Sequence, residues 1–525
     1  KYRYIRPEYA TITGLETILQ ASTGLMSFPR ASGILLHPTS FPGPYGIGDL
    51  GPAAYRFIDF LAASQQKLWQ ILPLGAPGFG NSPYLAYSAM AGNPLLISPD
   101  RLAEQGLLPA SDLAPLPAES PDQASFEAAA PFKMALFRKA YETFKANNQT
   151  QRQQDFEAFC QEKASWLEDY ALFMAIKTAH GGSGWTSWEE GLVRRDPVAI
   201  ARWREQLQDD IAFQKYLQFE FFSQWSELRR YCNDRGIEII GDIPIYVAHD
   251  SVDVWANPEN FCLNPHSFQP SLMAGVPPDY FSATGQLWGN PVYNWDYLHQ
   301  TGFAWWLQRF ESLMDYVDII RIDHFRGLQA YWVVPEGENT AMNGWWVEAP
   351  GYALFNRIRE HLGKLPIIAE DLGIITPEVD ALRDTFDFPG MKILHFAFDS
   401  GTENPYLPFN YGNANCVVYT GTHDNNTTVG WFEERSLQEQ WRVLPYLEHR
   451  SPHGIHWDMI RLALESVANQ AIIPLQDLLG LGTEARMNFP SRAAGNWGWR
   501  YRSEALLPEI SDRLAQLTTA HGRGT

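Results

Sequence analysis

The stretch that decides the fold is residues 317–327, Val-Asp-Ile-Ile-Arg-Ile-Asp-His-Phe-Arg-Gly, an apolar β-branched run that ends in charge. This pattern is typical of a buried parallel strand where it emerges at a site. Side chains alternate along a strand, so Arg321 and Asp323 are expected on one face. A guanidinium beside a carboxylate lowers the pKa of the carboxyl group and keeps it ionised. The stretch therefore predicts either a covalent nucleophile at a strand end or a structural ion pair.

Seven further apolar runs repeat the pattern, and each ends in a polar or Gly/Pro-rich loop. In chain order, all eight runs are 33–37, 68–74, 237–247, 317–323, 366–370, 391–398, 416–424 and 471–475. Helix-length patterns separate the later runs, for example at 351–362 and at 377–386, where Thr-Pro-Glu is a helix-start signal. Strands that alternate with helices imply a parallel sheet, and eight of them predict a (β/α)8 TIM barrel of the α/β class. A doubly wound open sheet is the structural alternative.

The uneven spacing of the runs predicts insertions into the barrel. Residues 1–29 are expected to form an N-terminal arm, and 30–525 the catalytic barrel. About 95–230 are rich in helical pattern and predict a mainly helical insertion. About 248–316 predict a loop-rich insertion at the active-site cleft, because loops of this length usually have a function.

Composition excludes several kinds of partner. The 60 acidic residues exceed the 40 basic ones by 20, so the formal charge of −20 argues against nucleic acid or an anionic membrane. There is no run of 18 apolar residues and no apolar core of a secretory signal at the N-terminus, so no membrane partner is expected. The four cysteines are far apart and lack metal-ligand spacing, which predicts reduced thiols in a cytosol-like compartment.

A second strand ends in acid at residues 367–373, Ile-Ile-Ala-Glu-Asp-Leu-Gly. The adjacent Glu370 and Asp371 point to opposite faces, so only one of them can face the barrel mouth. An acid among apolar neighbours has a raised pKa, as a proton donor requires. The alternative is a cap on the following helix.

A third strand runs into polar residues at 417–426, Val-Val-Tyr-Thr-Gly-Thr-His-Asp-Asn-Asn. His423 and Asp424 are possible metal ligands, but no metal-binding spacing surrounds them. A hydrogen-bonding clamp on a polyhydroxyl ligand suits them better. Residues 46–51 match GxGxxG, but a long Pro/Gly loop separates them from the first strand, so no dinucleotide cofactor is expected.

Carboxylates at three strand ends are typical of glycosidic chemistry. One Asp attacks the anomeric carbon, a Glu protonates the leaving oxygen, and the charged transition state is stabilised electrostatically. These residues leave retention, inversion, and an aldolase- or isomerase-type barrel all open.

Together, the motifs at 321–327, 369–373 (Ala-Glu-Asp-Leu-Gly) and 422–425 (Thr-His-Asp-Asn) resemble, in order, the catalytic motifs of the amylomaltase family, 4-α-glucanotransferases of glycoside hydrolase family 77. The resemblance runs from about Arg30 to the C-terminus. Further segments similar to the family are 35–51, 69–74, 82–84, 241–248 and 277–291.

The resemblance implies roles for individual residues. Asp323 becomes the nucleophile that forms a β-glucosyl-enzyme, Glu370 the general acid/base, and Asp424 the transition-state stabiliser. The implied substrate-binding residues are Arg321, His324, His423, Asp242, Tyr84, Asp279, Tyr280, Phe281, Gln286 and Trp288, of which Tyr84 and the last five would line a flexible loop beside the acceptor path.

The implied reaction is a retaining transfer of an α-1,4-glucan segment to the 4-hydroxyl of another sugar. It uses α-1,4-glucans and maltooligosaccharides and needs no metal or organic cofactor. The implied compartment is the cytoplasm or a plastid stroma. The family has no separate C-terminal β-domain, and the roughly 100 residues after Asp424 agree with this.

Two other functions remain as alternatives. One is an α-glucan hydrolase with the same carboxylates, and the other is a catalytically silent glucan-binding protein. The three intact carboxylates argue against the second. We also expect the loop at 276–291 to close over the covalent intermediate and to favour a sugar hydroxyl over water.

Overall fold

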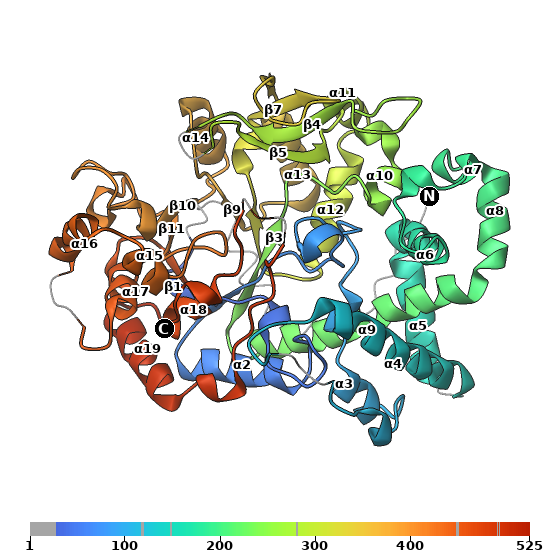
Figure 1. The fold of residues 1–525 in the computed structure, drawn as a ribbon, viewed down its shortest axis with the longest axis horizontal. Coiled ribbons are helices and arrows are strands. Elements are labelled where there is room, and N and C mark those ends of the chain that lie inside the picture. Colours follow the sequence, from blue (N-terminus) through green and yellow to red (C-terminus); the bar gives the residue numbers. More distant parts are fainter. Residues whose placement is uncertain are drawn as a thin grey trace.

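Eight parallel strands form the centre of the protein, in the order β10-β11-β12-β1-β2-β3-β6-β9 (Figure 1). The computed structural model describes residues 28–116, 120–147, 150–279, 282–447, 451–490, 492 and 494–524. The strands are β1 Ala31–Leu35, β2 Leu68–Gln70, β3 Glu238–Ile243, β6 Ile319–Ile322, β9 Ile367–Ala369, β10 Gly390–Ile393, β11 Cys416–Tyr419 and β12 Gln470–Pro474. Each of the eight predicted runs overlaps one of them.

The two edges of this sheet meet. The N–H of Ala369, at the end of β9, donates to the carbonyl of Pro389, directly before β10, at 2.9 Å. The sheet is therefore a nearly closed barrel, which confirms the predicted TIM barrel and excludes the open sheet. The barrel strands are covered on both faces, since all four residues of β6 and all five of β12 are buried.

Strand register brings the polar residues of neighbouring strands together. Arg321 on β6 pairs with Asp242 on β3 and with Ile368 on β9. Because parallel strands present their carboxyl ends at one face, Asp323 and Glu370, each just after its strand, reach the same mouth.

The helices surround the barrel and fill its long connections. In chain order they are α2 Pro52–Ala63, α3 Pro99–Glu104, α4 Phe126–Ala146, α5 Thr150–Glu162, α6 Ala164–Ala179, α7 Glu190–Val193, α8 Pro197–Gln206, α9 Gln208–Asn233, α10 Val252–Ala256, α11 Trp295–Gln300, α12 Ala304–Met314, α13 Gly351–Leu362, α14 Pro377–Thr385, α15 Thr428–Glu433, α16 Leu437–Val443, α17 Ile455–Glu465, α18 Leu475–Leu478 and α19 Pro508–Ala520. The helices predicted at 351–362 and 377–386 are α13 and α14.

Helices α3 to α9 lie between β2 and β3 and occupy the right side of Figure 1. Two of these helices, α5 and α6, are separated by the single residue Lys163. Lys163 ion-pairs with Asp315, at the C-terminal end of α12, at 2.6 Å. The break therefore lies at a contact with a distant helix.

A second sheet, antiparallel and four-stranded, lies at the top of Figure 1 in the order β5-β4-β7-β8. Its strands are β4 Leu272–Val276, β5 Gln286–Pro291, β7 Ala330–Pro335 and β8 Trp345–Glu348. The sequence analysis did not anticipate it, because its short strands come from the connections on either side of β6 and pair only after the barrel brings those connections together.

Among the residues that the structure describes, no helix is long and apolar enough to cross a membrane. Cys160, Cys232, Cys262 and Cys416 are all free thiols, as predicted.

Candidate active site

Arg321 links two of the acidic residues at the barrel mouth. Its Nη1 donates to both carboxylate oxygens of Asp242, each at 2.7 Å. Its Nη2 lies 3.1 Å from Oδ1 of Asp323. The side chains of Arg321 and Asp242 are 4% and 0% exposed. The prediction that Arg321 and Asp323 share one face is confirmed, but the guanidinium is divided between two carboxylates.

The pKa of Asp323 is shifted in the direction opposite to the prediction, mainly because the carboxyl group is buried. Burial raises the pKa of Asp323, and the charges of Asp242 and Asp424 raise it further, whereas Arg321 lowers it. The net shift is upward, so the prediction of a lowered pKa is wrong. The reason is that desolvation disfavours the charged carboxylate more than one shared guanidinium favours it.

Tyr84 connects Asp242 to the third strand end. Its hydroxyl donates to Oδ2 of Asp242 at 2.7 Å and lies 2.9 Å from Nε2 of His423. Because the hydroxyl proton points to Asp242, Nε2 of His423 carries the hydrogen of the second bond. The two rings stack, with centroids 5.3 Å apart and planes at 17°. Burial lowers the pKa of His423, so the imidazole is held neutral.

Asp424 is held by a segment that the sequence analysis missed. Nδ2 of Asn488 donates to Oδ1 of Asp424 at 2.6 Å, and Nη2 of Arg486 donates to its main-chain carbonyl at 2.6 Å. The N–H of Asn488 also donates to the carbonyl of His423 at 3.1 Å. Asn488 follows no strand end and belongs to no charged cluster, so no local pattern indicates it.

Glu370 is fixed by two main-chain donors. Its Oε2 accepts the N–H of His324 at 2.7 Å, and its Oε1 accepts the N–H of Leu372 at 3.0 Å. Burial raises the pKa of Glu370, and the charge of Asp323 raises it further. The direction of the predicted shift is confirmed, and the chemistry suits a carboxyl group that carries a proton near neutral pH.

His324 has the left-handed backbone conformation, with φ of 51°. A non-glycine residue in this region is uncommon and often lies at a functional site. The turn directs the N–H of His324 to Glu370, which joins the ends of β6 and β9. Backbone strain here orients a carboxyl group.

Asp371 points away from the mouth. It accepts the N–H of Met391 at 2.7 Å and ion-pairs with Arg383 of α14. The neighbouring acids therefore divide as predicted, with Glu370 toward the mouth. Neither caps α14, which begins at Pro377.

The aromatic side of the mouth comes from the antiparallel sheet. The ring of Trp288 on β5 meets the ring of His324 edge-on at 4.9 Å. Nε1 of Trp288 donates to Oε1 of Gln286 at 3.2 Å. Asp279 accepts the N–H of Ser282 within the β4–β5 loop at 2.8 Å. The two other residues of that loop in the predicted set, Tyr280 and Phe281, lie outside the described residues.

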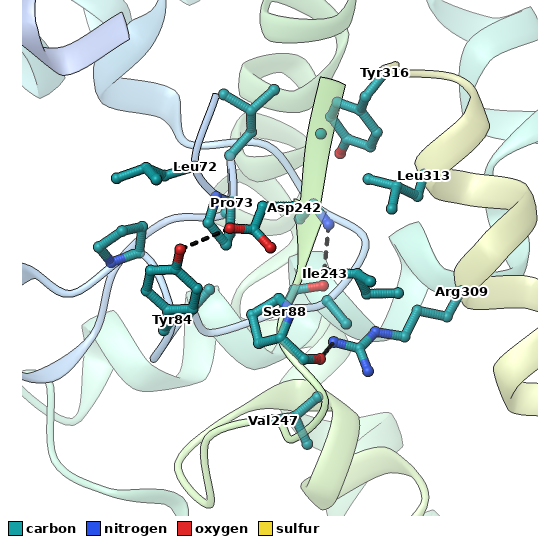
Figure 2. Close-up of a pocket in the computed structure, with 18 of the residues that line it drawn as sticks. Leu72, Pro73, Tyr84, Ser88, Asp242, Ile243, Val247, Arg309, Leu313 and Tyr316 are labelled. Carbon is teal, nitrogen blue, oxygen red and sulfur yellow. Dashed lines mark hydrogen bonds between the residues drawn. The ribbon is translucent and has the colours of Figure 1, made fainter. Parts of the chain in front are cut away.

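Behind Tyr84 and Asp242 is a cavity of about 60 Å³, lined mainly by apolar side chains. Figure 2 shows Tyr84 and Asp242 pointing toward one another beside Leu72 and Leu313. Apolar surroundings strengthen charge interactions because the local dielectric constant is low. Asp242 therefore faces mainly apolar surroundings, which strengthen its interaction with Arg321.

The structure brings most of the predicted residues into one network. Asp242, Arg321, Asp323, Tyr84, His423 and Asp424 are connected by hydrogen bonds or ion pairs, and Glu370, Trp288 and Gln286 join them through His324. Among the described residues, no group of three or more His, Cys, Asp and Glu side chains is arranged to hold a metal ion.

A (β/α)8 barrel with acids at the carboxyl ends of three strands defines the class: a barrel enzyme of carboxylate chemistry. A family model described as 4-alpha-glucanotransferase matches residues 36–506. The chain therefore belongs to that family, glycoside hydrolase family 77, and is an enzyme with 4-alpha-glucanotransferase activity.

Individual relatives agree with the family model. A 4-alpha-glucanotransferase of Synechocystis sp. (strain ATCC 27184 / PCC 6803 / Kazusa) is 58% identical over 495 residues, or 94% of this chain and 98% of the relative. One of Thermus thermophilus is 47% identical and covers 95% of this chain and 100% of its own. The solved structure of amylomaltase from Streptococcus agalactiae in complex with acarbose is 41% identical, with a TM-score of 0.91 over 94% of this chain and 100% of that one.

Proposed function

We propose that this 4-alpha-glucanotransferase works by a retaining double displacement through a covalent glucosyl intermediate on Asp323. The donor is an α-1,4-glucan or maltooligosaccharide, and the acceptor is the 4-hydroxyl of another such chain. The observation that carries the proposal is the pairing of Asp323 with Arg321 beside Glu370, whose pKa is raised. Burial raises the pKa of both carboxyl groups, but Arg321 opposes the rise at Asp323, so Asp323 ionises first and Glu370 keeps the proton.

In the first half of the reaction, a carboxylate oxygen of Asp323 attacks the anomeric carbon, and the bond from that carbon to the glycosidic oxygen breaks. The proton of Glu370 passes to that oxygen, and the shortened chain leaves with a new 4-hydroxyl. Arg321 stays paired with Asp242 and limits the rise in the pKa of Asp323, which favours the ionised nucleophile.

In the second half, the ionised Glu370 takes the proton of an incoming 4-hydroxyl, whose oxygen attacks the anomeric carbon and displaces Asp323. Two inversions give net retention. Asp424, oriented by Asn488, stabilises the positive charge that develops on the sugar ring in both steps.

Substrate binding is proposed for the polar and aromatic residues around these acids. His423 is held as a neutral donor by Tyr84, and His324 and Trp288 form an edge-to-face pair over the mouth. The amylomaltase of Streptococcus agalactiae was solved in complex with acarbose, which supports a saccharide ligand for this site. The four free thiols support a reducing compartment, such as a cytoplasm or plastid stroma.

The direct test is the product ladder from pure maltotriose, with an Asp323→Asn variant as control. Transfer predicts glucose with maltopentaose and longer chains, and almost no gain in reducing ends. Glucose and maltose with rising reducing ends would instead establish a hydrolase. An Asp323→Asn variant as active as the parent would contradict the assigned nucleophile.

A further inference from the structure

An exposed apolar surface lies beside the loop that leaves Glu370. It consists of Trp346 on β8 and Ile374, whose residues are 38% and 61% exposed. The guanidinium of Arg326 joins them: its central carbon lies 3.9 Å from the Trp346 ring centroid, and its Nη1 donates to the carbonyl of Ile374 at 2.7 Å. We call Trp346 and Ile374 the Trp346 platform.

The platform is tied to the catalytic centre on both sides. Arg326 follows Asp323 by three positions in the strand-end motif, and Ile374 follows Glu370 by four. Arg326 therefore connects the loop after β6 with the loop after β9 through a hydrogen bond to the main chain. The platform is therefore attached to the two loops that carry Asp323 and Glu370.

The indole ring is held in place before any ligand arrives. Trp346 pairs with Trp332 across β7 and β8, and the two rings meet edge-on at 5.3 Å. Nε1 of Trp332 donates to the carbonyl of Ala341 at 2.9 Å. A ring fixed in this way loses little side-chain entropy when a ligand binds it.

The platform also continues from the β4–β5 loop. The N–H of Ala341 donates to the carbonyl of Thr284 in that loop at 3.1 Å. Met342, next in the chain, is 56% exposed and adds apolar surface. The segment that leads into β8 is therefore attached to the β4–β5 loop and carries an exposed apolar side chain.

The position of Glu370 decides which part of a glucan reaches this surface. A general acid that protonates the leaving oxygen lies on the leaving-group side of the broken bond, where the acceptor later enters. We propose that the Trp346 platform is a distal acceptor-side subsite that binds the pyranose faces of long α-1,4-glucan chains. This inference rests on the proposed function of Glu370. The part of the indole that remains exposed, 38% of the residue, offers sugar C–H groups an apolar contact area at low entropic cost.

The test measures binding without turnover. In an Asp323→Asn background, calorimetry gives the Kd of maltoheptaose and of maltose with and without Trp346→Ala. We expect maltoheptaose to bind about tenfold more weakly after the substitution, as the loss of one aromatic contact implies, and maltose to change less than twofold. Trp441→Ala is the matched control, because Trp441 is 70% exposed on α16, at the left of Figure 1, away from the four-stranded sheet.

A second variant tests the platform in case Trp346→Ala does not fold. Ile374→Ser removes the apolar side chain but keeps the carbonyl that accepts from Arg326, and it should weaken maltoheptaose binding about threefold. In the otherwise unmodified enzyme, both variants should lower the ratio of kcat/KM for maltoheptaose to that for maltotriose.

Three outcomes would overturn the proposal. Unchanged maltoheptaose affinity in both variants would do so directly. Equal weakening for maltose and maltoheptaose would make Trp346 a positioning residue for the Glu370 loop. A change in sedimentation with constant sugar affinity would make the platform a protein interface. Failure of the proposed function is a separate result, visible as full turnover by Asp323→Asn.

Discussion

Substituting Asp242 by Asn should move the acid limb of the pH profile of kcat/KM to lower pH. Asp242 is a buried anion that shares Arg321 with Asp323, and its charge raises the pKa of Asp323. Without that charge, Arg321 forms an ion pair with Asp323 alone. The nucleophile is then ionised at lower pH, and the acid limb follows it.

The size of the shift follows from the geometry. Contacts of 2.7 Å and 3.1 Å on one guanidinium place the two carboxylates roughly 6 Å apart, and at an effective dielectric constant of about 20 their repulsion is about 2.8 kcal/mol. That energy corresponds to about two pH units, and because Arg321 lies between the two charges we expect about one.

The assay is initial-rate disproportionation of maltotriose from pH 4 to 9 at fixed ionic strength. Tyr84→Phe is the matched control, because it removes the 2.7 Å hydrogen bond to Asp242 without changing the charge. An acid limb that stays in place or moves to higher pH in Asp242→Asn would refute the reasoning. An equal shift in Tyr84→Phe would assign the effect to the hydrogen bond.

Three further predictions concern the rest of the site. Glu370→Gln should lower kcat by about 10²- to 10⁴-fold and abolish the basic limb of the pH profile, since activity is lost as pH rises through the raised pKa of Glu370 and Gln does not titrate; a basic limb that persists would assign the proton donor elsewhere. Asn488→Ala should lower kcat about tenfold with a smaller change in KM, because the 2.6 Å bond that orients Asp424 is lost, and equal effects on both constants for maltotriose would contradict a positioning role. Shortening the β4–β5 loop between Val276 and Gln286 should raise the ratio of hydrolysis to transfer, measured as reducing ends formed per glucose released, and an unchanged ratio would show that the loop does not exclude water.

Much of the fold could be predicted from the sequence because its signals are local. A strand that is buried on both faces is mostly apolar, and all eight barrel strands lie in such runs, from Ala31–Leu35 to Gln470–Pro474. Parallel topology then brings strand ends together, so Asp323 and Glu370 could be placed at one mouth without coordinates.

The antiparallel sheet could not be predicted in the same way. Its strands have mixed burial, and β8 is largely exposed, so no periodic apolar signal marks them. Their pairing depends on the barrel bringing together the connections before and after β6. Trp346 and Arg326 meet only through that pairing.

The sequence by itself determined which acidic and basic side chains this protein has. It also determined where the barrel strands lie along the chain. Tertiary structure decided how those groups behave. The pKa of Asp323 is raised because the carboxyl group is buried and faces the charges of Asp242 and Asp424, and Asp424 is oriented by Asn488 from a segment 64 residues away. Desolvation and long-range hydrogen bonding depend on what surrounds a group in space, and a linear sequence does not contain that information.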